Sequence, residues 1–181
     1  MKTSKIINSW IIIIIIVTVI LAAVFSILSE LALSKLSITF AFITLLIIIS
    51  IGVIFDIIGV ASAVADDKFF HAMASKKIDI AKYSLFITKN APKFSSFCSD
   101  VIGDIAGIVS GAAGTVIVIS LINMYGLKNG ALLSVLMSSS IAGLTVGGKA
   151  LGKEIAIDKS KEIILYSAKV VKFFDRFFKF V

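Results

Sequence analysis

Residues 101–125 read VIGDIAGIVSGAAGTVIVISLINMY. This run is long enough to cross a bilayer, because about 20 apolar residues suffice at roughly 1.5 Å per residue. Its single charge is Asp104, and at helical spacing one face carries Asp100, Asp104, Gly107, Gly111 and Gly114. Glycine lets a neighbouring helix approach closely, and an aspartate at membrane depth faces a bundle interior or a wet cavity. The stretch therefore predicts a central helix of a membrane bundle, with other helices packed on its glycine face.

The overall composition is that of a membrane protein. Hydrophobic residues make up 59% of the 181 residues, against about 45–50% in soluble domains. One cysteine and one histidine exclude a disulfide framework, a Cys/His metal cluster and a Cys–His nucleophile pair. The net charge of +7 comes from lysines, with Arg176 as the only arginine. Lysine lacks the bidentate geometry with which arginine reads phosphate and guanine, so we expect no nucleic-acid partner.

Three further apolar runs occupy residues 10–28, 36–65 and 131–148. The first is longer than the apolar core of a signal peptide and has no A-x-A site after it, so we interpret it as a retained anchor, with a cleaved signal as the alternative. The second exceeds the bilayer thickness and must tilt, bend or continue beyond the membrane. The short turn at residues 126–130 makes the fourth run antiparallel to the third. We predict an all-α membrane protein with four transmembrane helices.

The segment 66–100 is polar, with six lysines and four aspartates, yet its apolar residues recur at helical spacing. We interpret it as an amphipathic juxtamembrane belt of two short helices, with Asn90-Ala91-Pro92 as a break; a solvated loop is the alternative. From Lys149 onward the chain is again basic and amphipathic, which predicts a basic amphipathic C-terminal helix. The predicted organisation is an anchor and loop at 1–35, a membrane domain at 36–165 and a basic aromatic interfacial tail at 166–181.

The basic residues are distributed unevenly between the two predicted faces of the bundle. Two lie in residues 1–8, six in 66–100 and eight from Lys149 onward, whereas the other two loops carry only Lys35 and Lys128. Loops on the cytoplasmic side carry the excess of lysine and arginine. The distribution predicts a multi-pass protein of the plasma membrane, with both termini and the belt in the cytoplasm.

Acidic residues within the apolar runs are the candidate site. Asp56 lies on a face of small residues with Gly52, Gly59 and Ala63, as Asp104 does in its own run. Ser62, Ser140 and Thr145 offer hydroxyl oxygens, and glycines expose backbone carbonyls. Such oxygens suit a hard cation such as Mg²⁺, which keeps several waters. Two alternatives stay open: the carboxylates reach the cytoplasmic headgroups, and the glycine faces serve helix packing alone.

The order of these elements resembles the membrane domain of the cyclin M/CorC (CorB) family of magnesium and cobalt transport proteins. The resemblance covers about residues 36–165 and rests on the following motifs: Gly59-Val60-Ala61-Ser62, the belt, Ala91-Pro92-Lys93-Phe94, Ile102-Gly103-Asp104 and Gly148-Lys149-Ala150. It implies a divalent-cation site formed by Asp104, Asp56, Ser62, Gly103 and Thr145. Asp104 stands where the family has Asn, Ile108 falls where it has a second Asn, Thr145 stands where it has an acidic residue, and Gly148 where it has Pro. The family's regulatory nucleotide-binding domains are not expected here.

These observations lead to a divalent-cation (Mg²⁺/Co²⁺-type) transporter-like membrane protein. We expect a homodimer associated through the glycine faces, in contact with lipid. The departures at Thr145 and Ile108 favour the alternative, a non-transporting accessory or scaffold protein with a transporter-like bundle. An enzyme is not expected, because no base–nucleophile pair can be named, and no cofactor other than the ion itself is implied.

Overall fold

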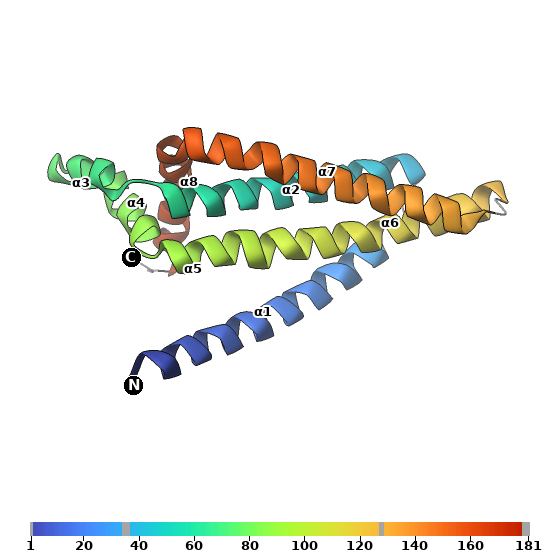
Figure 1. Ribbon diagram of the computed structural model, residues 1–181, viewed down its shortest axis with the longest axis horizontal. Coiled ribbons are helices and arrows are strands. Elements are labelled where there is room, and N and C mark those ends of the chain that lie inside the picture. The colour runs from blue at the N-terminus through green and yellow to red at the C-terminus, as the bar shows by residue number, and fades with distance from the viewer. Residues whose placement is uncertain (1, 34–36, 127–128, 179–181) are drawn as a thin grey trace. The chain divides into compact units, whose positions relative to one another are not determined.

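The computed structural model describes residues 2–33, 37–126 and 129–178, and every regular element in these ranges is helical. Four of its helical segments are long and apolar enough to cross a membrane (Figure 1): α1 (Lys2–Leu33), α2 (Ile38–Val64), the run Ala91–Tyr125, and α7 (Gly130–Asp158). A helix satisfies its backbone hydrogen bonds internally, as the bilayer interior requires. The predicted all-α membrane fold with four spans is confirmed. Lys35, Lys128 and the last three residues of the predicted tail lie outside the described ranges.

The third span begins earlier than predicted. A continuous helical run of 35 residues comprises α5 (Ala91–Ser95), the π-helical segment η1 (Ser96–Gly103) and α6 (Asp104–Tyr125). Pro92 is in its first turn, where the missing N–H costs no hydrogen bond. The sequence placed the start at residue 101 because apolar residues begin there. Asp104 therefore lies more than three turns from the helix start instead of one.

The fourth span also extends further than its apolar run. α7 continues through Lys149 to Asp158, and α8 (Ser160–Phe178) begins two residues later. Lysine and glutamate end an apolar pattern without ending a helix, because both are good helix formers. The predicted division between residues 165 and 166 falls inside α8, which is a single helix.

The chain divides into two compact units. Unit 1 comprises residues 1–52 and 101–148, and unit 2 comprises residues 53–100 and 149–181. α2, η1 and α7 each contribute to both. Each unit has its own buried core.

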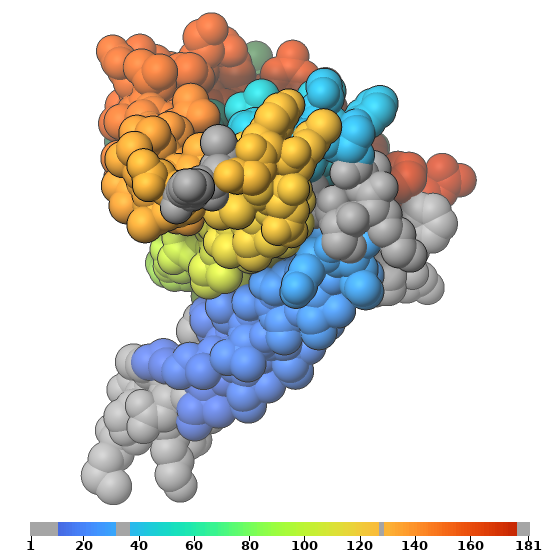
Figure 2. Space-filling view, turned by 90° about the vertical axis from the view of Figure 1, so that its right-hand side faces the viewer, coloured from blue at the N-terminus to red at the C-terminus, as the bar shows by residue number. Residues whose placement is uncertain are grey.

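In unit 1 the core forms where α6 meets α1. Val101, Ile105 and Val109 are buried on one side of the third span. They pack against Ile14, Leu21 and Ala22 of α1 and Ile48 of α2. Most other side chains of residues 11–31 are exposed, as the blue helix in Figure 2 shows, with isoleucines 11–13, 15 and 16 about half exposed. This is the exposure expected of a helix that meets lipid.

The glycine face of α6 is packed only at one end. Gly114 is buried against Ile141 and Met137 of α7, so a side chain there would collide with them. Gly107 and Gly111, by contrast, have no atom within 4 Å of the position of an added Cβ. Within one copy of the chain, the predicted packing of helices on the glycine face is therefore present at Gly114 and not at Gly107 or Gly111. α6 is instead buried through neighbouring faces that carry larger side chains, which exclude more apolar surface from solvent.

In unit 2 the core joins five helices. Its fully buried members are Phe70 of α3 (Asp67–Ser75), Ile87 of α4 (Ile80–Lys89), Ile164 and Ala168 of α8, Ala61 of α2 and Ala156 of α7. Asp66 caps α3 by accepting a hydrogen bond from the backbone N–H of Lys68 at 2.9 Å. Both short helices predicted for the belt are thus present, and Phe70 and Ile87 on their apolar faces pack within the protein itself.

Candidate functional site

Asp56 is the buried acidic residue of α2. Only 6% of its surface is exposed. Its Oδ2 oxygen is buried and has no hydrogen-bond partner among the described residues. Neither α2 nor η1 contains a lysine or an arginine. Buried polar atoms are paired in the great majority of proteins, so an unpaired carboxylate oxygen requires a proton, a water molecule or a cation.

The π-helical segment packs directly against the turn of α2 that carries Asp56. The Ser99 hydroxyl donates a 3.4 Å hydrogen bond to the backbone carbonyl of Asp56. Gly59, one turn further along α2, allows this approach: a Cβ there would collide with the Ser99 hydroxyl and lie 3.1 Å from the Ser95 carbonyl oxygen. Single π-helical turns within α-helices occur frequently at functional sites. On the small-residue face predicted for α2, Gly59 is thus packed against Ser95 and Ser99, and Gly52 is packed against Ala106 of α6.

Ser62 is 1% exposed and donates a 2.7 Å hydrogen bond to the Gly59 carbonyl oxygen of its own helix. The hydroxyl proton of Ser62 is therefore used in a hydrogen bond within α2, as is common for serine in membrane helices. Its oxygen still has lone-pair capacity for a cation. Asp56 and Ser62 are the two predicted ligands that belong to unit 2.

The other three predicted ligands belong to unit 1. Asp104 is an exposed residue at the start of α6, and Gly103 before it is buried. Thr145 is half-buried and donates a 2.8 Å hydrogen bond to the Ile141 carbonyl oxygen of its own helix. The two carboxylates thus differ in environment, because Asp56 is enclosed and Asp104 is open to the surroundings.

Within the described ranges, no group of three or more histidine, cysteine, aspartate or glutamate side chains is placed to hold a metal ion. A cation at Asp56 would therefore be held by one carboxylate, by hydroxyl and carbonyl oxygens, and by water. Mg²⁺ accepts such a set, since it commonly keeps several of its waters.

Sequence reasoning missed the part played by η1. The run Ser95-Ser96-Phe97-Cys98-Ser99 was assigned to the polar belt, although it lies in the third helical run and faces Gly59. Three serines in five residues directly before an apolar span were the available signal. The π-helical geometry itself has no signature in a single sequence.

Comparison of this chain with family models, with curated proteins and with solved structures finds no match in any of the three. The function must therefore be argued from the residues of the two units.

Proposed function

We propose that the chain is a divalent-cation transporter-like membrane protein whose principal ion-binding carboxylate is Asp56. The observation that carries the proposal is the buried Oδ2 oxygen of Asp56, which has no partner among the described residues. An ionised carboxylate at membrane depth is costly unless a positive charge accompanies it. Neither α2 nor η1 carries a basic side chain, and the counter-charge in this proposal is a bound cation.

The oxygen-bearing groups at Asp56 favour a hard cation such as Mg²⁺ as the bound ion. The Ser99 hydroxyl donates a hydrogen bond to the backbone carbonyl of Asp56, and Gly59 lets η1 approach this turn of α2 closely. Carboxylate, hydroxyl and carbonyl oxygens suit Mg²⁺ over softer transition metals, which prefer thiolate or imidazole. Asp104, Gly103 and Thr145 are secondary in this proposal, because Asp104 is exposed and Thr145 bonds its own helix.

The same proposal includes the family and the topology. The motif order resembles the cyclin M/CorC membrane domain, and the lysine distribution supports a plasma-membrane protein with cytoplasmic termini. The cytoplasmic face would then carry α3, α4 and α8.

A second candidate is a non-transporting membrane scaffold that assembles through its glycine face. The observation that favours it is the open space beside Gly107 and Gly111, since glycines that are not covered let the helix of a second copy approach closely. Asp104, exposed near that face, would then have a role at an interface or at the headgroups.

Mg²⁺-dependent thermal stabilisation of the purified protein in detergent tests the first candidate. Binding to the folded state raises stability by about 2.7 kcal/mol at a hundredfold excess over Kd. We expect Mg²⁺ to stabilise the wild type and Asp104→Asn, and to have no effect on Asp56→Asn. Equal stabilisation of all three would refute the Asp56 site. Mg²⁺ uptake into proteoliposomes then separates the candidates, because a scaffold gives no flux.

A further inference from the structure

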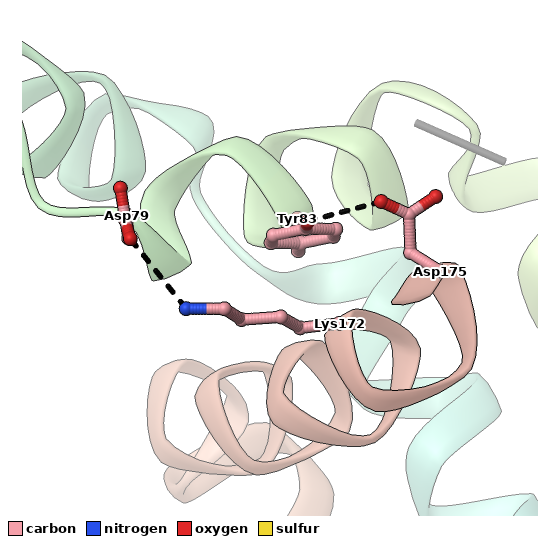
Figure 3. A network of polar contacts seen from close by, with 4 residues as sticks. All are labelled: Asp79, Tyr83, Lys172 and Asp175. Carbon is pink, nitrogen blue, oxygen red and sulfur yellow. Dashed lines mark hydrogen bonds and ion pairs between the residues drawn. The ribbon is translucent and has the colours of Figure 1, made fainter. Parts of the chain in front are cut away.

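Unit 2 contains a surface pocket that the cation proposal does not use. The pocket has a volume of about 570 Å³ and lies between the turn that joins α3 to α4 and the side of α8. Three lysines line it, Lys77, Lys82 and Lys172, together with Asp79 and Tyr83. Figure 3 shows Lys172 and Asp175 of α8 reaching toward Asp79 and Tyr83 across this region. The lining therefore carries three positive charges and one negative charge.

The turn that presents Lys77 has an unusual backbone. Lys77 has a φ of 57°, in the left-handed region that side-chain-bearing residues seldom adopt. Such a conformation costs free energy and persists where the surrounding structure fixes it, often at functional sites. Here it ends α3 and leads into Asp79 just before α4. The consequence is that Lys77, Asp79 and Lys82 line one pocket although they come from a turn and a new helix.

The acidic residue of the pocket is held weakly. The Lys172 ammonium lies 3.6 Å from Oδ2 of Asp79, and these side chains are 47% and 89% exposed. Exposed ion pairs of this kind contribute little to stability. Lys82 lies with its ammonium 5.6 Å from the centroid of the Tyr83 ring. An anion richer in oxygens than a carboxylate would therefore compete well with Asp79 for Lys172.

From this geometry we propose that the pocket binds a phosphate group. Lysine ammonium groups commonly bind phosphate in proteins. Their hydrogen bonds to phosphate oxygens are charge-assisted and therefore stronger than hydrogen bonds between neutral groups. The group has two possible sources, a lipid headgroup and a free phosphate. The outer side of α8 carries an exposed apolar row, Tyr166, Val170 and Phe173, at the helical spacing of an interfacial helix. This row would bring lipid headgroups within reach of the pocket.

Thermal unfolding of the full chain in neutral detergent, at constant ionic strength, tests the proposal. The probes are inorganic phosphate, dioctanoyl phosphatidic acid and, as a control without net charge, dioctanoyl phosphatidylcholine. We expect phosphatidic acid to raise the unfolding temperature of the wild type. A response to phosphatidic acid alone identifies the lipid headgroup as the source, and an equal response to inorganic phosphate identifies a soluble phosphate. No response to either phosphate probe would overturn the proposal.

Matched variants separate a pocket from diffuse surface charge. The double variant Lys77→Gln/Lys82→Gln should weaken binding roughly tenfold or more, because two charge-assisted contacts are lost. The control Lys153→Gln/Lys159→Gln removes the same charge from exposed positions outside the pocket and should change the affinity less than about twofold. Asp79→Asn should tighten binding, whereas Glu162→Gln, also outside the pocket, should not. Equal weakening in both double variants, or weaker binding in Asp79→Asn, would contradict the site.

Discussion

The Tyr83 hydroxyl donates a 3.0 Å hydrogen bond to Oδ2 of Asp175, which joins α4 to α8 across 92 residues of sequence. Figure 3 shows this bond beside the ion pair of Lys172 with Asp79. The two contacts lie at the edge of the interface whose buried side contains Ile87 and Ile164. The apolar contacts supply most of the attraction between the helices, since they remove apolar area from water. The hydrogen bond and the ion pair together fix the orientation of α8 on α4.

Because of this hydrogen bond, we expect the stability of unit 2 to fall as the pH rises in the alkaline range. The bond to Asp175, burial and the nearby carboxylates raise the pKa of Tyr83 above its ordinary value of 10.0. The folded state then holds the proton to higher pH than the unfolded state does, so stability is fully present below about pH 10 and falls as pH rises through the folded-state pKa. We expect the unfolding temperature to fall less steeply above pH 10 in Tyr83→Phe than in the wild type. Identical slopes would mean that the bond does not persist in solution.

The effect of Asp56→Asn on the stability of the Mg²⁺-free protein shows whether Asp56 carries a buried charge. If Asp56 is an empty cation site, Asp56→Asn relieves a buried charge and stabilises the metal-free protein, by about 1–3 kcal/mol. If the carboxyl is a structural hydrogen-bonding group, the same substitution destabilises the protein with and without Mg²⁺. Chemical or thermal unfolding in detergent distinguishes the two signs. Glu154→Gln, at an exposed position of α7, is the control, and we expect it to change the stability by less than about 0.5 kcal/mol.

The close approach of η1 to α2 depends on the absence of a side chain at Gly59. We expect Gly59→Ala to destabilise the protein by about 1–3 kcal/mol, because the new methyl group lies too close to the Ser95 carbonyl and the Ser99 amide, which are both backbone. Gly143→Ala is the matched control, because nothing lies within 4 Å of its added Cβ. In the control, the better helix propensity of alanine should stabilise by up to about 1 kcal/mol. Similar effects in both variants would contradict the packing described for η1.

The two ends of the α6 glycine face should respond differently to a bulky residue. Gly114→Leu should lower the unfolding temperature of the isolated chain, since leucine would collide with Ile141 and Met137 of α7. At Gly111 an added Cβ meets no atom within 4 Å, so Gly111→Leu should lower that temperature less than Gly114→Leu does. If copies of the chain associate through this face, Gly111→Leu should reduce the dimer fraction measured by light scattering in detergent. An unchanged dimer fraction would place this face against lipid.

The predicted topology can be tested by cysteine labelling in a Cys98→Ala background. Cys98 is buried, and its removal leaves single introduced cysteines as the only reactive thiols. Asn129 and Lys76 are both exposed, and the lysine distribution places them on opposite sides of the membrane. We expect a membrane-impermeant maleimide to label intact cells at position 129 and not at position 76. The reverse pattern would contradict cytoplasmic α3, α4 and α8.

By itself, the sequence determined the fold class, the number of spans and the turn between the last two. Long apolar runs allow few alternatives, because lipid leaves only internally hydrogen-bonded helices. The sequence determined less about where the helices begin and end. α5 and η1 extend the third span at its start, and α7 continues past Lys149. Polar residues interrupt an apolar pattern without ending a helix.

Tertiary structure decided which of the candidate residues are enclosed. Asp56 and Asp104 have the same side chain on similar small-residue faces, yet Asp56 is buried beside η1 and Asp104 is exposed. Likewise Gly114 is packed and Gly111 is open, although both lie on one face of one helix. Helical periodicity places residues on a face, but the burial of that face depends on which neighbouring helix covers it, and that is set by packing between segments far apart in the chain.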